Sequence, residues 1–199
     1  MPNFHRFTLK AQESLQGAQE LVARYHHGEL KGLHLLASLL EDETTLVRPM
    51  LVHANANLQT LEEEIDGHLE RFPKIFAMQG QVNQLYLSQE LMKILDRAAD
   101  IAMKQKDEFV SCEHLLLALM EIPSVVQDIL TRSAVRSDAL LRALKELRGS
   151  MKITDETPET KFNVLEKYSQ NITERARQGK LDPVIGSTEE LRRLMQILS

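Results

Sequence analysis

Residues 110–130, VSCEHLLLALMEIPSVVQDIL, closely resemble residues 31–51, KGLHLLASLLEDETTLVRPML, about 80 residues earlier in the chain. In both copies a histidine, His34 or His114, precedes a run of Leu, Met and Ala. The match extends backwards along the chain, where Leu15, Ala18, Leu21 and Val22 fall opposite Leu95, Ala98, Ile101 and Ala102. Because an internal repeat fixes the architecture before any single motif does, the chain is interpreted as a duplication.

Each copy shows apolar residues at helical spacing in four blocks. In the first copy the blocks begin near Thr8, at about residue 32, near Leu46 and near Asn57, and in the second copy Ser88 takes the place of Thr8 as an N-cap. A small four-helix unit leaves part of its apolar face uncovered, so two copies should cover each other. The sequence therefore predicts an all-α domain over residues 1–149, built from two pseudo-symmetric four-helix repeats at about 7–71 and 88–149.

After Gly149 the composition changes. Residues 151–161, MKITDETPETK, are polar and lack helical periodicity, which predicts a flexible linker over residues 150–163. Apolar residues at helical steps return within residues 164–199, but they are too few to make a core of their own. We expect this last part to be the beginning of a further, incomplete domain.

Composition limits the classes of function. The chain has 199 residues, 43% hydrophobic and 27% charged, with a net charge of −5 and interspersed acids and bases, so a nucleic-acid partner is not expected. No apolar run approaches the roughly 20 residues that cross a bilayer, and the start MPNFHRFT lacks the apolar core of a signal peptide. Its single cysteine, Cys112, agrees with a reducing compartment. We expect a cytoplasmic protein with no membrane partner.

Two residue patterns suggest chemistry but have simpler explanations. His34 and His114 have no further ligand at fixed spacing, so packed or capping histidines are favoured over a metal site. Cys112, Glu113 and His114 include nucleophile, acid and base types, yet neighbours on a helix cannot face one another. The sequence therefore predicts neither a metal site nor catalytic residues.

The repeat also carries a family resemblance. FTLKAQ near the start, GLHLLASLL in the first copy and CEHLLLALM in the second resemble the Clp N-terminal repeat domain. The segment LEKYSQNITERARQGKLDPVIGSTEELRRLMQILS is similar to the opening of the first AAA+ α/β module of Clp/heat-shock 100 unfoldases, ClpB-type disaggregases in particular. In ClpC-type domains a Glu tends to precede each repeat's histidine and is associated with binding phosphorylated arginine, whereas here Glu113 remains but Leu33 stands in the first copy. An aliphatic residue cannot bind a guanidinium, which favours the ClpB type.

The resemblance implies the N-domain of a homohexameric ATP-dependent chaperone that binds exposed apolar segments of unfolded or aggregated polypeptides. By family position the substrate-binding residues are Thr8, Asp107 and Glu113. Their alternative interpretations are an N-cap, an ordinary loop acid and a solvated helix residue. The complete chaperone is expected to work with a co-chaperone of the heat-shock 70 type, while this chain alone is expected to be monomeric.

Family position also implies that Val184 and Ile185 contact the adenine of ATP in the complete module. Ser187 stands where the family usually has Arg, so a polar contact of that turn is in question. No GxxxxGK[ST] phosphate loop occurs in the chain, which is therefore expected to be no enzyme and to hold no cofactor, with ATP and Mg belonging to the parent protein. Two other classes stay open: a ClpC- or ClpA-like domain that docks a folded adaptor, and a stand-alone structural repeat protein.

Overall fold

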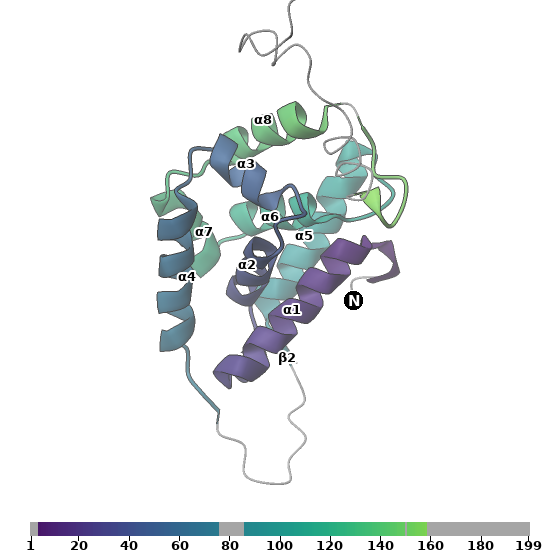
Figure 1. Ribbon diagram of the computed structural model, residues 1–199. Helices are drawn as coiled ribbons and strands as arrows, with labels where there is room; N and C mark the ends of the chain where they lie inside the picture. Colours follow the sequence, from purple (N-terminus) through teal and green to yellow (C-terminus); the bar gives the residue numbers. More distant parts are fainter. Residues whose placement is uncertain (1–3, 76–85, 150, 159–199) are drawn as a thin grey trace, which may run out of the picture. The chain divides into compact units, whose positions relative to one another are not determined.

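The computed structural model describes residues 4–75, 86–149 and 151–158 (Figure 1). The chain divides into two compact units, Met1–Phe162 and Asn163–Ser199. The predicted AAA+ beginning at 164–199, with Val184, Ile185 and Ser187, lies outside the described residues, and so do residues 150 and 159–163 of the predicted linker.

The described part of the first unit is mostly helical, as predicted. The first copy comprises a short 3-10 helix (Phe4–Arg6), α1 (Leu9–Tyr25), β1 (Glu29–Leu30), α2 (Gly32–Glu41), α3 (Val47–His53) and α4 (Leu58–Arg71). The second copy comprises β2 (Tyr86–Leu87), α5 (Gln89–Gln105), α6 (Cys112–Glu121), α7 (Val125–Arg132) and α8 (Ser137–Arg148). The all-α fold of two four-helix copies is confirmed.

The copies share their helix ends as well as their apolar pattern. Thr8 Oγ1 accepts a hydrogen bond from the Ala11 amide at 3.2 Å, and Ser88 Oγ accepts the equivalent bond from the Leu91 amide at 3.0 Å. These side chains satisfy amide groups that a helix leaves unpaired at its start. At the other end, α1 and α5 both stop at a residue in the left-handed conformation, His26 with φ 57° and Lys106 with φ 61°.

Short strands join the two copies reciprocally. β1 pairs in parallel with β2, Glu29 opposite Tyr86 and Leu30 opposite Leu87, while Phe7 forms a parallel bridge with Val110. In each case the segment before the first helix of one copy pairs with the segment before the second helix of the other. The copies are therefore related by an approximate two-fold axis. Strands of two residues are too short to leave an alternating pattern, so the sequence did not predict them.

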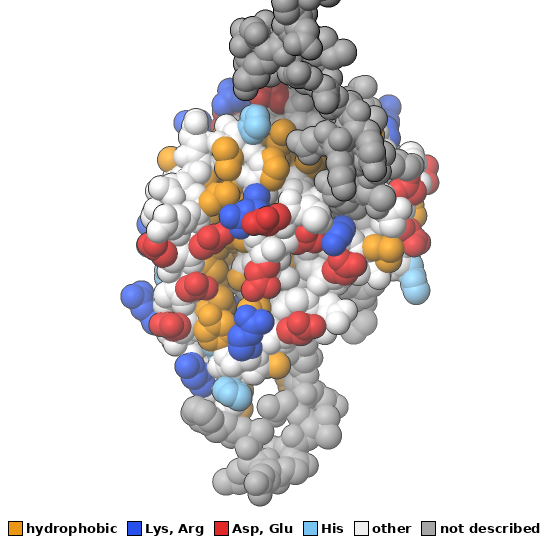
Figure 2. Space-filling view, in the orientation of Figure 1, with side chains coloured by type: hydrophobic (Ala, Val, Ile, Leu, Met, Phe, Trp, Pro, Cys, Tyr) orange, Lys and Arg blue, Asp and Glu red, His pale blue; other side chains and the backbone are white. Residues whose placement is uncertain are grey.

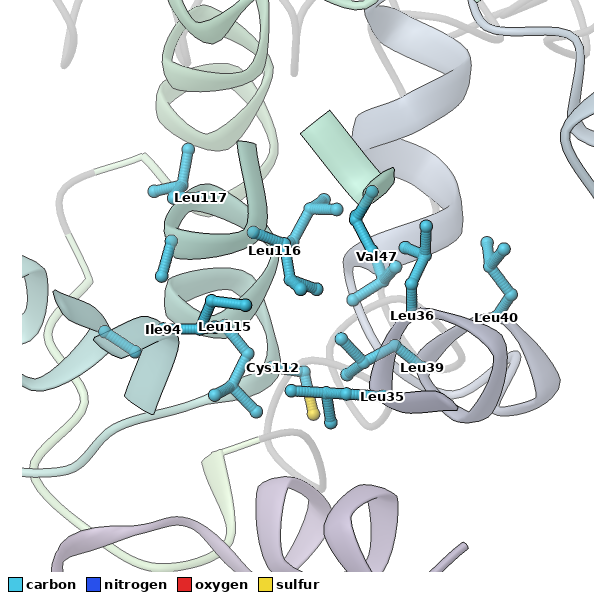
Figure 3. Close-up of a cluster of buried hydrophobic side chains, with 14 of the residues drawn as sticks. Leu35, Leu36, Leu39, Leu40, Val47, Ile94, Cys112, Leu115, Leu116 and Leu117 are labelled. Atoms are coloured by element: carbon cyan, nitrogen blue, oxygen red, sulfur yellow. The ribbon is translucent and has the colours of Figure 1, made fainter. Parts of the chain in front are cut away.

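The core lies where α2 and α6 meet. Figure 3 shows Leu35 and Leu39 of α2 directed toward α6, with Leu36 beside Val47, and these side chains, with Leu115 and Leu116 of α6, are fully buried. Burial of a side chain of this size contributes about 1.5–3 kcal/mol. Around this centre, helix α3 contacts α8 and α4 contacts α7, so the outer helices of one copy pack on those of the other. The mutual covering expected from the duplication is confirmed.

The leucine-rich helices belong to this interior. No single helix among the described residues has both the length and the apolar character needed to span a membrane. α6 and α7 meet that test only as a pair, and the chain bends by 92° between them.

Residues 151–158 differ from the prediction of a flexible linker beginning at 150. The Ile153 side chain is fully buried, and the Glu108 amide donates to the Ile153 carbonyl at 2.9 Å. Three residues further on, the Glu156 carbonyl accepts from the Leu9 amide at 2.8 Å. Residues 151–157, here called the strap, are thus fixed to the domain. A single buried apolar residue and backbone pairing leave no periodicity in a polar segment, which explains the difference.

Candidate functional site

Two of the predicted site residues belong to a buried ion cluster. Asp107, Glu113 and Arg148 are only 4%, 3% and 6% exposed. Arg148 Nη2 donates to both carboxylate oxygens of Asp107, and Arg148 Nη1 lies 3.6 Å from Glu113 Oε1. The alternative interpretations of Asp107 as an ordinary loop acid and of Glu113 as a solvated helix residue are therefore wrong.

His114 completes the cluster without adding a charge. Its Nδ1 accepts a hydrogen bond from the Ser111 amide at 3.0 Å, so this nitrogen carries no proton. The ring is then neutral, and its Nε2 donates to Asp107 Oδ2 at 3.1 Å. Burial acts to raise the pKa of Asp107, but the hydrogen bonds from His114 and Arg148 outweigh it and hold the pKa well below its usual range. One guanidinium thus faces two carboxylates.

The Asp107 carboxylate also holds the strap. Asp107 Oδ1 accepts from the Ile153 amide at 3.0 Å, while Arg148 Nε donates to the Met151 carbonyl at 2.7 Å. Together with the bond from the Glu108 amide to the Ile153 carbonyl, these contacts bind a stretch of backbone by its amide and carbonyl groups. The residues around Asp107 can therefore bind a polypeptide through its backbone, independently of most of the polypeptide's side chains.

Thr8 lies at the other end of the strap. Its amide donates to the Val110 carbonyl at 2.9 Å, and the amide of the next residue, Leu9, donates to the Glu156 carbonyl of the strap. The structure thus places Thr8 and Asp107 along one stretch of chain, and Glu113 is linked to that stretch through Arg148. All three side chains are buried, however, with Thr8 fully so, and Thr8 does serve as the N-cap of α1.

The equivalent place in the first copy has a different chemistry. His27, His34 and Leu69 stand where the second copy has Asp107, His114 and Arg148. The Lys31 amide donates to His34 Nδ1 at 3.1 Å, so the neutral ring donates from Nε2 to His27 Nδ1 at 2.8 Å. Burial, followed by the neighbouring His27, lowers the pKa of His34 to about 4. One scaffold therefore carries an ionic cluster in one copy and a neutral imidazole pair in the other.

His34, His114 and Cys112 are engaged in structural contacts. His34 and His114 cap the starts of α2 and α6, in agreement with the prediction of packed or capping histidines. Within the described residues, no group of three or more His, Cys, Asp or Glu side chains is placed to hold a metal. Cys112 Sγ lies 3.7 Å from Ser14 Oγ, and both His114 nitrogens are engaged by other partners. Cys112, Glu113 and His114 therefore do not form a catalytic triad.

Sequence reasoning missed Arg148, the cation of the cluster. The signal was available in the repeat, because α4 and α8 align at an offset of 79 residues and their buried positions coincide. At that offset Arg148 replaces Leu69 on the apolar face of the helix. A charged residue at a core position requires a buried partner.

The fold and these sites define the chain as a repeat domain of the Clp type. The family description "Clp repeat (R) N-terminal domain" matches residues 6–133, and the chain belongs to this family. The chaperone protein ClpB 1 of a Nostoc species is 37% identical over 98% of the chain. The Hsp104 N-terminal domain of Candida albicans is 26% identical, with a TM-score of 0.67, covering 77% of this chain and 98% of that one.

Two further comparisons set the scope of the similarity. A ClpV N-domain solved in complex with a VipB peptide has a TM-score of 0.58 over 77% of this chain and 92% of that one, and at 17% identity it shares the fold alone. The chain spans 22% of the length of the Nostoc ClpB, and 23% of the ClpB of Bacillus cereus, which is 34% identical over 99% of the chain.

Proposed function

We propose that this chain is the substrate-recognition domain of a ClpB-like, ATP-dependent chaperone. It binds exposed apolar segments of unfolded or aggregated proteins and passes them to the pore of the ATPase. The observation that carries this proposal is the similarity to ClpB chaperones over 98–99% of the chain, including the region after the repeats. The hexamer, the bound ATP and Mg and a co-chaperone of the heat-shock 70 type belong to the complete protein in this proposal.

Thr8, Asp107 and Glu113 form the client site in this proposal. The strap supports it, because here a segment with one buried apolar side chain, Ile153, is bound by its backbone. A client segment has the same two elements, an apolar side chain and a free amide and carbonyl. The client therefore takes the place of the strap, which leaves Asp107 when a client binds.

Such binding should be weak. A disordered client spends part of its binding free energy on becoming ordered, and here it must also displace a segment tethered to the same chain. Weak binding suits a domain that hands its client onward.

A binding assay with one protein in two states tests the function. A reduced and alkylated protein that stays unfolded should bind the chain, whereas the same protein in its native state should not. Preference for a folded adaptor over the unfolded chain would instead support the ClpC- or ClpA-like alternative. Absence of binding to either would support a structural repeat protein.

Two neighbouring substitutions test the site. Ile153→Ala removes the buried side chain that fastens the strap and should tighten binding of the unfolded client several-fold. Thr154→Ala changes the adjacent exposed residue and should leave the affinity unchanged. If the client binds the Ile153→Ala variant and the unsubstituted chain equally, the strap does not compete with the client and the site assignment is wrong. The proposed function can still hold in that case.

A further inference from the structure

Each copy has a cleft between the end of its first helix and its last helix. In the second copy, Lys104, Lys106, Leu141, Lys145 and strap residues line a cleft of about 460 Å³. In the first copy, Arg24, Tyr25, Ile65 and Asp66 help to line a cleft of about 350 Å³. Arg24 is equivalent to Lys104 at the offset of 80, and Ile65 and Asp66 are equivalent to Leu144 and Lys145 at the offset of 79. The two clefts are therefore the same place in the two copies.

The second-copy cleft is uniformly basic. Its lining includes five basic side chains and, among the described residues, no Asp or Glu: Lys104, Lys106, Lys145, Arg148 and Lys152. Lys104, Lys106 and Lys145 are exposed and form no ion pair within the described part of the chain. Arg148 is paired with Asp107 and Glu113, so the exposed positive charge comes from the four lysines, and it stands out in a chain whose net charge is −5.

The first-copy cleft is mixed in charge. Arg24 Nη1 lies 3.9 Å from Glu41, and Arg48 Nη1 lies 2.7 Å from Glu62, while Asp66 adds a further negative charge. Figure 2 shows acidic and basic side chains interspersed over the face that α1, α2 and α4 present. The duplicated scaffold therefore does not itself impose a basic cleft.

Helix ends give only a partial explanation of the lysines. Lys104 and Lys145 lie in the last turns of α5 and α8, where a cation offsets the negative end of the helix dipole. In the first copy the position of Lys145 is occupied by Asp66, but α4 runs five residues beyond it, to Arg71, so Asp66 lies outside the last turn. The helix dipole therefore accounts for part of the positive charge, and it does not explain the strap residue Lys152.

We propose that the second-copy cleft binds an acidic peptide segment that also carries apolar side chains. Carboxylates of the segment meet Lys104, Lys106 and Lys145. Its apolar side chains contact Leu141 and Met151, which line the cleft and remain 45% and 39% exposed. The volume is in the range of pockets that take a few side chains. The cleft adjoins the client site, because Arg148, Met151 and Lys152 line it, but its exposed lysines lie on α5, just after it, and on α8.

A peptide fits this surface better than a nucleic acid does. A long polyanion gains affinity by spreading over many cations, and the overall charge of −5 repels it outside the cleft. A short acidic segment meets only the local lysines. The exposed Leu141 and Met151 also offer nothing to a phosphate backbone but do suit leucine or methionine side chains.

Three labelled peptides of the same length test the proposal by fluorescence anisotropy on the whole 199-residue chain. They share their leucines and differ in having Glu, Gln or Lys between them. The Glu peptide should bind most tightly, and its affinity should fall as salt rises because these charges are exposed to solvent. A single-stranded oligonucleotide is titrated in parallel.

The variants use the first copy as a guide. Lys145→Asp introduces the residue found at the equivalent first-copy position. Combined with Lys104→Glu, as the cleft variant, it should weaken binding of the Glu peptide by about fivefold to tenfold. Lys93→Glu reverses one charge on α5, as Lys104→Glu alone does, but about 16 Å from Lys104 along the helix and outside the cleft, and it should weaken binding of the Glu peptide far less than Lys104→Glu alone. Helical content measured by circular dichroism confirms that each variant is folded.

Equal binding of the Glu and Gln peptides would overturn the proposal, and so would equal losses in Lys93→Glu and the cleft variant. Tighter binding of the oligonucleotide than of the Glu peptide through the same lysines would also overturn it in favour of a nucleic-acid site. Binding of the unfolded client is measured on the same variants. If the cleft variant loses binding of the unfolded client together with binding of the Glu peptide, the two sites are one.

Discussion

Arg148 Nη2 donates to both carboxylate oxygens of Asp107, a residue 41 positions earlier in the chain. The contact joins the end of α8 to the loop between α5 and α6, and through Met151 and Ile153 it also reaches the strap. In the first copy the position of Arg148 is occupied by the buried Leu69. The second copy thus carries a buried charge where the fold accepts an aliphatic side chain.

Arg148→Leu should therefore be strongly destabilising. It leaves the buried carboxylates of Asp107 and Glu113 without their cation, and breaking such a pair costs about 3–5 kcal/mol. Urea unfolding followed by circular dichroism measures the loss. The triple variant Asp107→His, Glu113→Leu and Arg148→Leu copies the residues of the first repeat and should recover much of it. A stable Arg148→Leu protein would show that the cluster does not hold the domain together.

Acidification should weaken the fold through His34. Its pKa is lowered from 6.5 to about 4 on folding, so the unfolded chain takes up a proton first as the pH falls. The contribution of the neutral His34 ring to the free energy of unfolding is fully present above about pH 6.5. It is lost progressively down to about pH 4, by an amount on the order of 3 kcal/mol. Unfolding free energies at pH 7.5, 5.5 and 4.5 measure this loss. An NMR titration in which the His34 ring protonates near pH 6.5 in the folded state would contradict the geometry.

The paired N-caps separate a structural role of Thr8 from a role in binding. Thr8→Ala and Ser88→Ala each remove a side chain that accepts a hydrogen bond from the first turn, and each should cost about 1 kcal/mol. Only Thr8 lies beside the strap, so only Thr8→Ala should also change the affinity for an unfolded client. Equal effects of both substitutions on client affinity would show that Thr8 acts only as a helix cap. Thr8→Ser serves as the control that keeps the cap.

Sequence reasoning went furthest where the physical signal is local. The apolar periodicity and the capping residues placed the start of α2 at about residue 32 and the start of α4 near Asn57, and the structure agrees. The duplication also predicted that the copies cover each other. These features depend on residues within one helix or on a comparison between the copies.

The sequence was less informative where a contact joins distant residues. Burial of Asp107 and Glu113 depends on Arg148, and fixing of residues 151–157 depends on one buried isoleucine and on backbone hydrogen bonds. None of these contacts has a characteristic spacing. The cleft lysines were overlooked for the same reason, because they come from two helices and the strap.

The strap offers the most direct test of the proposed function. Hydrogen exchange is followed at the Ile153 and Leu9 amides, which donate to Asp107 and to Glu156. A saturating amount of an unfolded client should release the strap, measured as increased exchange over residues 151–157, while the Leu9 amide, which then donates to the client, and the amides inside α2 and α6 stay protected. Binding of the client with unchanged exchange over the strap would contradict the claim that a client takes its place beside Thr8, Asp107 and Glu113.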